Sequence, residues 1–318
     1  MAENNSKKNR WAVCIISSRE DCSVLLATLK YTLKACPNNT AIIDVIVNGN
    51  KNLADELVNR IKLTKCEDIL ENKVRIWCIN IPDKAMAWNC YINQIWNGSE
   101  LVFFIDGYVQ PHKNSLSRME SKLSAQSEAL AITGVPTCGR TANRLCEAML
   151  REGGLHGNLF AIKGIVVNKM KKIGFNLPIG IYRVDSVIGA VIAFNLDPSA
   201  NEWDIKKRII VSREVTWNVP SLNRFSFLYL KTSLKRRVRQ SQGVLENLAV
   251  KQHLAILRKA PGDMPKTVKL LIEKWIKGET VYNRIKLFID PFVLYSYYNL
   301  INKKELIDIK VKELKLKN

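Results

Sequence analysis

The sequence predicts an α/β protein with a mostly parallel central sheet, followed by a basic, mainly α-helical region. Short apolar runs rich in β-branched residues alternate with helically spaced segments up to Asp106, which is typical of a parallel sheet wound with helices. Charge is unevenly distributed, because residues 206–318 hold 25 Lys and Arg against 9 Asp and Glu, or +16 of the net charge of +20. We therefore expect an α/β domain over residues 1–225 and a basic helical region over residues 226–318.

Four strands are expected in the first third of the chain, each an apolar run that ends in polar residues. They are Trp11–Ser17, Ala41–Val47, Lys73–Ile79 and Leu101–Ile105. The segments between them have helical spacing, and the expected helices are Val24–Cys36, Leu53–Leu63 and Ala85–Trp96. A later strand is expected within Ile210–Pro220. Because connections between parallel strands are right-handed, the loops after the four strands should lie along one edge of the sheet.

The run Leu101–Ile105 delivers a carboxylate to that edge. The run is apolar enough to be buried on both faces, and Asp106-Gly107 then forces a turn. An Asp at the end of a buried strand faces a cation, a hydrogen-bond donor or solvent in a cleft, and the alternative is an Asp that only begins a turn. Glu20, Asn48 and Lys84 should converge with Asp106, and such a set suits a nucleotide. The loops contain neither GxGxxG nor GxxxxGK[ST], so the usual dinucleotide and P-loop sites are not indicated.

Composition limits the classes of protein that the chain can represent. No apolar run approaches the roughly 20 residues that a membrane-spanning helix needs, and the N-terminus lacks the apolar core of a signal peptide, so we expect a cytoplasmic protein. The eight cysteines have no metal-like spacing, and we expect reduced thiols. The basic C-terminal part indicates a polyanionic partner, which is nucleic acid, an acidic lipid surface or an anionic substrate.

Four short motifs, in order, resemble those of the family-two glycosyltransferases, which have the nucleotide-sugar-binding GT-A fold. Lys84–Asn89 (KAMAWN) resembles the K-A-x-A-x-N segment, and Asp106, seventeen residues after Asn89, lies where the family has its D-x-D motif. Leu155–Lys163 (LHGNLFAIK) is similar to the acceptor-side G-x-x-x-A-x-[RK] segment. Leu177–Asp185 (LPIGIYRVD) resembles the stretch whose last Asp is the catalytic base. The resemblance extends over residues 11–225.

The resemblance implies an inverting transfer of a sugar from a nucleoside diphosphate sugar, with a UDP-sugar as the first expectation, to a hydroxyl group of a glycan or lipid-linked acceptor. The context that it suggests is surface-polysaccharide or lipid-linked glycan assembly. Asp185 would be the catalytic base, and Mg²⁺ or Mn²⁺ would bind at Asp106. The other expected site residues are, on the donor side, Glu20, Asn48, Lys84, Asn89, Arg236 and Arg239, and on the acceptor side, His156, Gly157 and Asn158.

The D-x-D motif is degenerate in this chain. Tyr108 stands where the second, metal-binding Asp is expected, so Asp106 alone would hold a divalent cation weakly. Lys84, Arg236 and Arg239 would then supplement or replace that cation, since ammonium and guanidinium groups bind diphosphate oxygens.

The base and the arginines also have ordinary structural interpretations. Val184 replaces the acidic neighbour that the family has before its base, and Asp185 can be a helix N-cap because Ser186 can begin a helix. Arg236 and Arg239 lie in the basic segment Lys231–Gln242, which can equally be a solvated helix face.

The C-terminal region is expected to form amphipathic helices. Residues 268–276 place apolar side chains on one face and Lys on the other, and Val281–Ile301 is rich in Tyr and Phe around Pro291. Such helices suit an anionic membrane surface, whereas helices that pack on the first domain or pair two subunits show the same pattern. The tail, Glu305–Asn318, is expected to be an edge strand or a frayed helix.

Two other functions stay open at the level of the sequence. A catalytically silent GT-A-like protein, which only holds a nucleotide sugar or a partner enzyme, agrees with Tyr108. Nucleic-acid binding agrees with the charge, but the sequence has no zinc-finger spacing, RNP-like aromatic motif or basic zipper.

Overall fold

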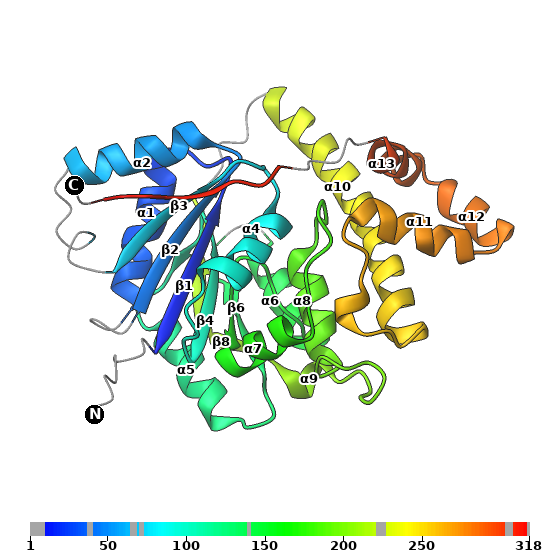
Figure 1. Cartoon of the computed structure of the whole chain (residues 1–318), viewed down its shortest axis with the longest axis horizontal. Coiled ribbons are helices and arrows are strands. Elements are labelled where there is room, and N and C mark those ends of the chain that lie inside the picture. Colours follow the sequence, from blue (N-terminus) through cyan, green and yellow to red (C-terminus); the bar gives the residue numbers. More distant parts are fainter. Residues whose placement is uncertain are drawn as a thin grey trace.

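The computed structural model describes residues 10–36, 41–63, 69, 73–138, 141–220, 227–302 and 308–316, with the backbone alone over 227–233. In this part of the chain the strands form one sheet in the order β5-β8-β6-β7-β4-β1-β2-β3-β9 (Figure 1). Their bounds are β1 Trp11–Ser17, β2 Ala41–Asn48, β3 Val74–Ile79, β4 Leu101–Asp106, β5 Gln110–Pro111, β6 Ala131–Pro136, β7 Leu159–Lys163, β8 Ile209–Asn218 and β9 Val311–Leu314.

The first four strands form the parallel half of the sheet. Strand β1 pairs in parallel with both β2 and β4, and β2 pairs in parallel with β3. Strand β7 is antiparallel to both of its neighbours, β4 and β6, while β8 runs parallel to β6. At the far edge β9 pairs antiparallel with β3. The carboxyl ends of β1, β2 and β4 therefore share one edge, as the sequence predicts.

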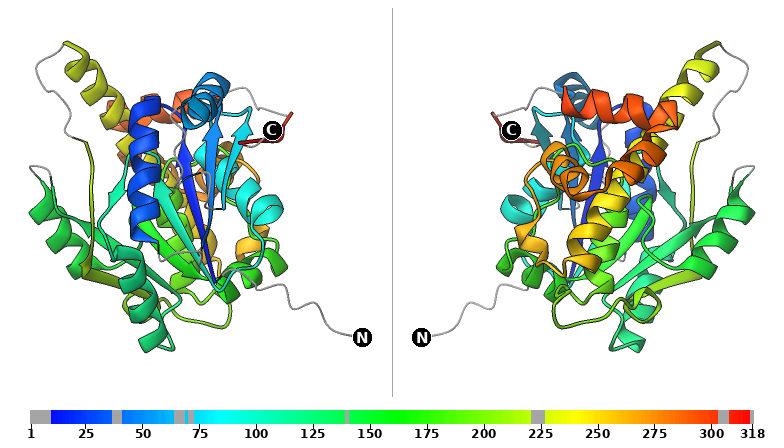
Figure 2. Two further views of the ribbon diagram at one scale, coloured as in Figure 1. Left: turned by 90° about the vertical axis from the view of Figure 1, so that its left-hand side faces the viewer. Right: turned by 90° about the vertical axis from the view of Figure 1, so that its right-hand side faces the viewer.

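Helices cover both faces of the sheet, because alternate residues of each buried strand point to opposite sides. In β1, Val13 and Ile15 belong to the apolar cluster beneath α1, α2 and α5, whereas Cys14 and Ile16 belong to the cluster beneath α4, α7, α8, α10 and α11. Figure 2 shows the sheet between α1 on one side and α4 on the other. The helix bounds are α1 Cys22–Ala35, α2 Lys51–Leu63, α4 Lys84–Cys90, α5 Ser115–Ala125, α6 Ala142–Glu152, α7 Gly164–Lys172, α8 Val184–Ala193, α9 Ile205–Arg208, α10 Phe227–Lys251, α11 Val268–Gly278, α12 Val281–Phe288 and α13 Pro291–Ile301.

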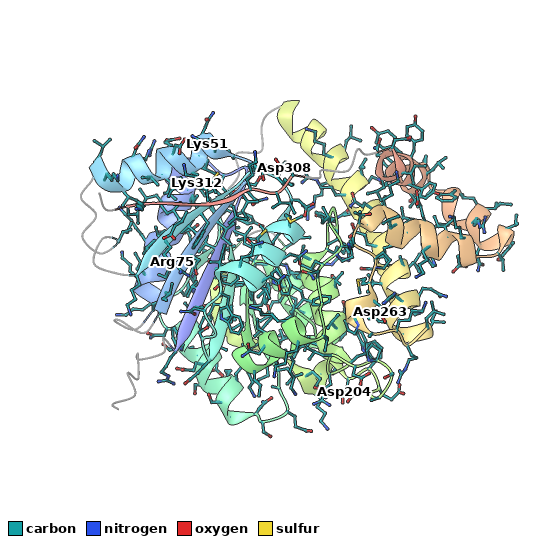
Figure 3. All side chains as sticks on the ribbon, viewed as in Figure 1. Lys51, Arg75, Asp204, Asp263, Asp308 and Lys312 are labelled. Carbon is teal, nitrogen blue, oxygen red and sulfur yellow. The ribbon has the colours of Figure 1, made fainter. Side chains whose placement is uncertain are left out.

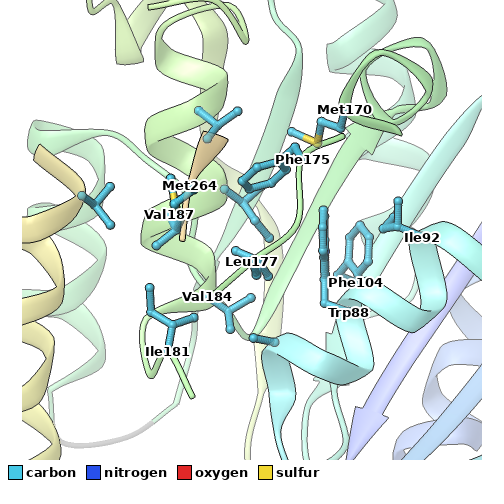
Figure 4. Close-up of a cluster of buried hydrophobic side chains, with 14 of the residues drawn as sticks. Trp88, Ile92, Phe104, Met170, Phe175, Leu177, Ile181, Val184, Val187 and Met264 are labelled. Carbon is cyan, nitrogen blue, oxygen red and sulfur yellow. The ribbon is translucent and has the colours of Figure 1, made fainter. Parts of the chain in front are cut away.

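Aromatic side chains hold α4 against the sheet under the edge that carries the polar loops. The indole of Trp88 lies 6.1 Å from the ring of Phe104 on β4 and 5.8 Å from Phe175, measured between ring centroids. Figure 4 shows Trp88, Phe104 and Phe175 in this cluster, with Val184 and Ile181 beside them. Because Lys84, Asp106 and Asp185 are attached to elements of this one packed core, their backbones are fixed relative to each other.

Most predicted elements are confirmed, with shifted ends. The third strand begins at Val74 rather than Lys73, and the helix expected over Ala85–Trp96 is α4 followed by a π-helical turn, Tyr91–Ile95. The strand expected within Ile210–Pro220 is β8. The tail forms an edge strand rather than a helix over Val311–Leu314, and the rest of its predicted range is only partly within the described residues.

The C-terminal helices pack onto the same core as the α/β part. Leu245 on α10 and Ile272 on α11 are fully buried in the cluster that contains Trp88. The predicted boundary after residue 225 falls beside residues 221–226, which lie outside the described part, and stays a prediction. No helix within the described residues is long and apolar enough to span a membrane.

Candidate functional site

A polar cavity of about 690 Å³ lies at the carboxyl ends of β1, β2 and β4. Ten of the eleven site residues expected from the sequence line it; they are Glu20, Asn48, Lys84, Asp106, His156, Gly157, Asn158, Asp185, Arg236 and Arg239. The eleventh, Asn89, does not line it. The two carboxylates on which the expected chemistry depends, Asp106 and Asp185, thus lie in a single cavity.

Asp106 ends β4 and pairs with a lysine. Its carboxylate, 15% exposed, forms an ion pair with Lys84 Nζ from the first turn of α4. The Tyr108 hydroxyl lies 3.3 Å from the other oxygen, Asp106 Oδ2, and 3.3 Å from Asn158 Oδ1. Burial raises the pKa of Asp106, and Lys84 opposes that shift. Burial lowers the pKa of Lys84, but the carboxylates around it outweigh burial and leave its pKa above the usual value, so Lys84 is charged at neutral pH.

Asp185 lies in the first turn of α8 and is held by a backbone donor. Gly157 N–H donates to Asp185 Oδ2 at 2.9 Å. Arg183 is the N-cap of α8, so the capping role that the sequence allowed for Asp185 is wrong. A Cβ atom at Gly157 would lie 3.4 Å from Asp185 Cγ and 3.5 Å from Lys84 Nζ. Gly157 therefore lies between the carboxylate of Asp185 and the ammonium of Lys84.

Glu20 and Asn48 shape the loops after β1 and β2. Glu20 Oε2 accepts hydrogen bonds from Ser17 Oγ at 2.6 Å and from Ser18 N–H at 2.8 Å, so this carboxylate is fixed within its own turn. With its amide oriented to satisfy both neighbours, Asn48 donates to the Ser17 carbonyl and accepts from Asp83 N–H. Both side chains stiffen the cavity wall through these bonds.

Asn89 has a different position from the one expected. Its side-chain amide donates to the Leu177 carbonyl and accepts from Leu177 N–H, each at 2.9 Å. This pair of bonds fixes the segment that leads to α8 against α4. Asn89 thus affects the site only by fixing the loop at Leu177. We assign it no contact with a nucleotide-sugar donor.

The loop at 156–158 carries the acceptor-side residues. The His156 ring stacks on Trp217 of β8 with 5.6 Å between centroids, and burial lowers its pKa, so the imidazole is neutral at neutral pH. Asn158 accepts the backbone N–H of Asp106 through its carbonyl at 3.1 Å. The acceptor-side loop is therefore tied to the strand end that bears Asp106.

Three further residues complete the site, and the sequence motifs did not single them out. Asp83 caps α4 by accepting Met86 N–H at 2.8 Å and also accepts Gly180 N–H at 2.8 Å, and its place just before a helix is the signal that could have found it. Gln242 of α10 donates to the Gly180 carbonyl at 3.1 Å and to Glu246 Oε1 at 2.7 Å. Glu246 is buried and has no such signal, because its backbone partners, Tyr182 N–H and Arg183 N–H, are more than sixty residues away.

A second, mainly apolar cavity of about 480 Å³ adjoins the first. Ser186, next to Asp185, lines both cavities. The segment from Gly153 to Leu155 lines the second cavity, and the residues that follow it line the first. Phe194 and Trp203, whose rings meet edge-on at 5.4 Å, form part of its wall.

The side chains around Asp106 do not fit a divalent cation. Within the described residues no group of three or more His, Cys, Asp or Glu side chains is placed to hold a metal ion. Asp106 already faces Lys84 and Tyr108, so a Mg²⁺ ion there would have to displace the ammonium and would gain a single protein carboxylate. Mg²⁺ or Mn²⁺ at Asp106 remains a prediction from the resemblance alone.

No protein-family model matches the sequence, and no curated protein sequence matches it. Among solved structures, the chain is similar to a mannosyltransferase from Pyrobaculum calidifontis in complex with GDP-Man and Mn²⁺, with a TM-score of 0.59 and 15% identity over 94% of this chain and 89% of that one. S. aureus TarS 1–349 aligns with a TM-score of 0.49 and 10% identity over 92% of this chain and 81% of that one. Glucosyl-3-phosphoglycerate synthase from Mycobacterium tuberculosis aligns with a TM-score of 0.47 and 13% identity over 75% of this chain and 79% of that one.

The fold follows from the first of these likenesses, together with the mostly parallel sheet described above. The chain has the GT-A glycosyltransferase fold, as the sequence predicts. At this level of identity the likeness concerns the fold, and what the site does has to be argued from its residues.

Proposed function

We propose that the protein transfers a sugar from a nucleoside diphosphate sugar to a hydroxyl acceptor with inversion at the anomeric carbon. The observation that carries the proposal is the shared cavity: Asp185 and the Lys84–Asp106 pair face the same space, with Gly157 between them. An inverting transfer needs a base on the side of the acceptor and positive charge on the side of the departing diphosphate. This cavity offers both.

In the proposed reaction Asp185 Oδ takes the proton of the acceptor hydroxyl, whose oxygen forms a bond to the anomeric carbon. The bond from that carbon to the diphosphate oxygen breaks, and the nucleoside diphosphate leaves with the electron pair. Gly157 N–H holds Asp185 in position without protonating it. Glu20 and Asn48 would meet the base and ribose of the donor, because they border the cavity at the ends of β1 and β2.

The surroundings of the cavity support the expected acceptor class. The adjoining apolar cavity begins at Ser186, beside the proposed base, so an acceptor with an apolar part, such as a lipid-linked glycan, has a place for that part. Helix α12 and its C-cap residue expose the apolar side chains Val281, Tyr282, Ile285 and Ile289. We propose a cytoplasmic protein that docks α12 and α13 on an anionic membrane surface and acts in lipid-linked glycan or surface-polysaccharide assembly.

The test of the proposed reaction is Asp185→Asn. The new side chain keeps an acceptor oxygen for Gly157 N–H but cannot take a proton, and general-base catalysis contributes typically ~10²–10⁴-fold. With a panel of UDP- and GDP-sugars and no acceptor, we expect the native protein to hydrolyse at least one donor slowly, with water in place of the acceptor, and so to release nucleoside diphosphate. We expect the rate of hydrolysis to be at least about 10²-fold lower in the Asp185→Asn variant, whereas its nucleotide affinity should be unchanged.

The matched control is Asp263→Asn, which removes an exposed carboxylate that does not line the cavity (Asp263 is labelled in Figure 3) and should leave the rate unchanged. Undiminished release in Asp185→Asn would remove Asp185 as the base. No release from any donor by the native protein would favour a catalytically silent GT-A protein.

A further inference from the structure

Given the proposed transfer reaction, on which this inference rests, we propose that Lys84 takes the place of a divalent cation, so that the protein binds the donor diphosphate without metal. The GT-A relative from Pyrobaculum calidifontis was solved with Mn²⁺, so the inference separates this chain from that structure. Three observations support it, and they concern the position of Lys84, the saturation of Asp106 and the charge of the cavity.

Lys84 is fixed at its backbone and directed into the cavity. It is the first residue of α4, whose N-cap Asp83 binds Met86 N–H with one oxygen and Gly180 N–H with the other, each at 2.8 Å. The lysine side chain, 36% exposed, reaches the carboxylate at the end of β4. Its Nζ also lies beside Gly157, on the side that faces Asp185. The ammonium therefore lies between the strand end and the proposed base, where it can face the charge that builds up on a departing diphosphate.

Each oxygen of Asp106 faces a polar hydrogen, and the single Tyr108 hydroxyl proton lies within reach of both Asp106 and Asn158 Oδ1. Lys84 Nζ binds Oδ1, and the Tyr108 hydroxyl lies 3.3 Å from Oδ2. A divalent cation at this carboxylate would have to displace the ammonium, and Tyr108 would supply a neutral phenol where the D-x-D motif has its second carboxylate. An ammonium carries three N–H donors, so Lys84 can keep its bond to Asp106 and donate to diphosphate oxygens at the same time.

The cavity as a whole is suited to an anion without further cations. Its lining contains five basic side chains, which are Arg19, Lys84, Arg183, Arg236 and Arg239. It contains four carboxylates, which are Glu20, Asp83, Asp106 and Asp185. Asp83 and Glu20 are bound by backbone N–H groups of nearby residues, so their charge is partly satisfied before a ligand arrives. A diphosphate would add an anionic partner for the arginines.

The experiment is calorimetric titration of UDP and GDP into the full chain, once in EDTA and once in excess Mn²⁺. We expect at least one nucleotide to bind in EDTA with an affinity that Mn²⁺ changes by less than about threefold. Binding that appears only with Mn²⁺ would overturn the inference and leave the proposed function standing. No binding of either nucleotide in either condition would overturn the inference and, for UDP- and GDP-sugars, the proposed function as well.

Substitutions of Lys84 test whether its charge is the one that binds the diphosphate. Lys84→Gln should weaken nucleotide binding in EDTA by roughly 10- to 100-fold, as the loss of a charged hydrogen bond does. Lys172→Gln, at an exposed lysine of α7 outside the cavity, is the control and should bind as the native chain does. Lys84→Arg keeps the charge and should keep metal-free binding, which guards against a Gln variant that fails to fold. Native affinity in Lys84→Gln would overturn the inference.

Discussion

At the scale of single residues, Gly157 is the position where the smallest change has the clearest expected effect. A methyl group there would lie 3.4 Å from Asp185 Cγ and 3.5 Å from Lys84 Nζ, which is ordinary van der Waals contact. Its φ is not in the left-handed region, so alanine is not strained. The added carbon would nevertheless fill the space between the proposed base and the proposed leaving-group charge.

We therefore expect Gly157→Ala to fold normally and to lose about 10²-fold of the transfer or hydrolysis rate, because a shift of about 1 Å at the reacting centre can cost this much. The melting temperature and the release of nucleoside diphosphate are the two measurements. Gly278→Ala, where an added Cβ meets nothing within 4 Å, is the control. A Gly157→Ala protein with native rate would place the reaction elsewhere in the cavity.

At the scale of elements, the loop before α8 depends on one buried carboxyl group of α10. Glu246 accepts Tyr182 N–H at 2.7 Å and Arg183 N–H at 3.0 Å, and Gln242 Nε2 donates to it at 2.7 Å. Burial raises its pKa from 4.5 to about 7, against the effect of these donors. The first turn of α8, with Asp185, begins directly after the residues that Glu246 holds.

This shift has a definite sign. The folded protein binds the proton of Glu246 more tightly than the unfolded chain does, so its contribution to the free energy of unfolding is fully present below pH 4.5 and is lost as pH rises through about 7. The loss amounts to roughly 3 kcal/mol at most, at 1.36 kcal/mol for each unit of pKa.

Glu246→Gln removes the titrating proton, so we expect the melting temperature of the variant to fall less than that of the native protein between pH 5 and pH 8. The measurement is the difference between the two curves of melting temperature against pH, since other groups titrate equally in both proteins. Parallel curves would contradict the assignment of this pH dependence to Glu246.

The elements also show how far the sequence could predict the site. Glu20, Asn48, Lys84 and Asp106 converge because parallel strands end at one edge, and that follows from the alternating pattern alone. Asn89 does not line the cavity, and the reason is geometric. It lies five residues after Lys84, which is about 140° around a helix, so the two side chains cannot face the same space.

Other features carry no local signal in the sequence. The sequence shows the β7 segment only as part of a motif, and its antiparallel pairing with β4 depends on where α6 returns the chain to the sheet. Glu246 meets its partners only because α10 packs against the loop before α8. Such contacts depend on the packed core, and a single sequence does not show which distant segments share one.

At the scale of the whole molecule, the apolar surface of α12 lies apart from the cavity. Val281, Tyr282, Ile285 and Ile289 are each at least 62% exposed, and Arg284 and Lys286 lie among them. An amphipathic helix with basic residues binds at the surface of an anionic bilayer with its apolar side chains among the lipids. Full burial of one such side chain contributes about 1.5–3 kcal/mol.

We expect the native protein to sediment with vesicles of phosphatidylglycerol and phosphatidylcholine more than with phosphatidylcholine alone. Ile285→Ser combined with Ile289→Ser should weaken that binding by roughly tenfold or more. Ile165→Ser is the control, because Ile165 is 64% exposed on α7, outside this surface. A double variant that sediments as the native protein does would assign α12 to another contact, such as a second copy of the chain.

Strand β9 has a consequence for synthesis of the protein. It is the last described element in the chain, yet it covers the open side of β3, and Asn80 secures it by accepting Lys310 N–H and donating to the Asp308 carbonyl, each at 2.8 Å. A nascent polypeptide on the ribosome therefore presents β3 with unpaired N–H and C=O groups until residues 311–314 have emerged. Uncovered strand edges recruit other chains, so we expect β3 to be a site of aggregation while the chain is being synthesised.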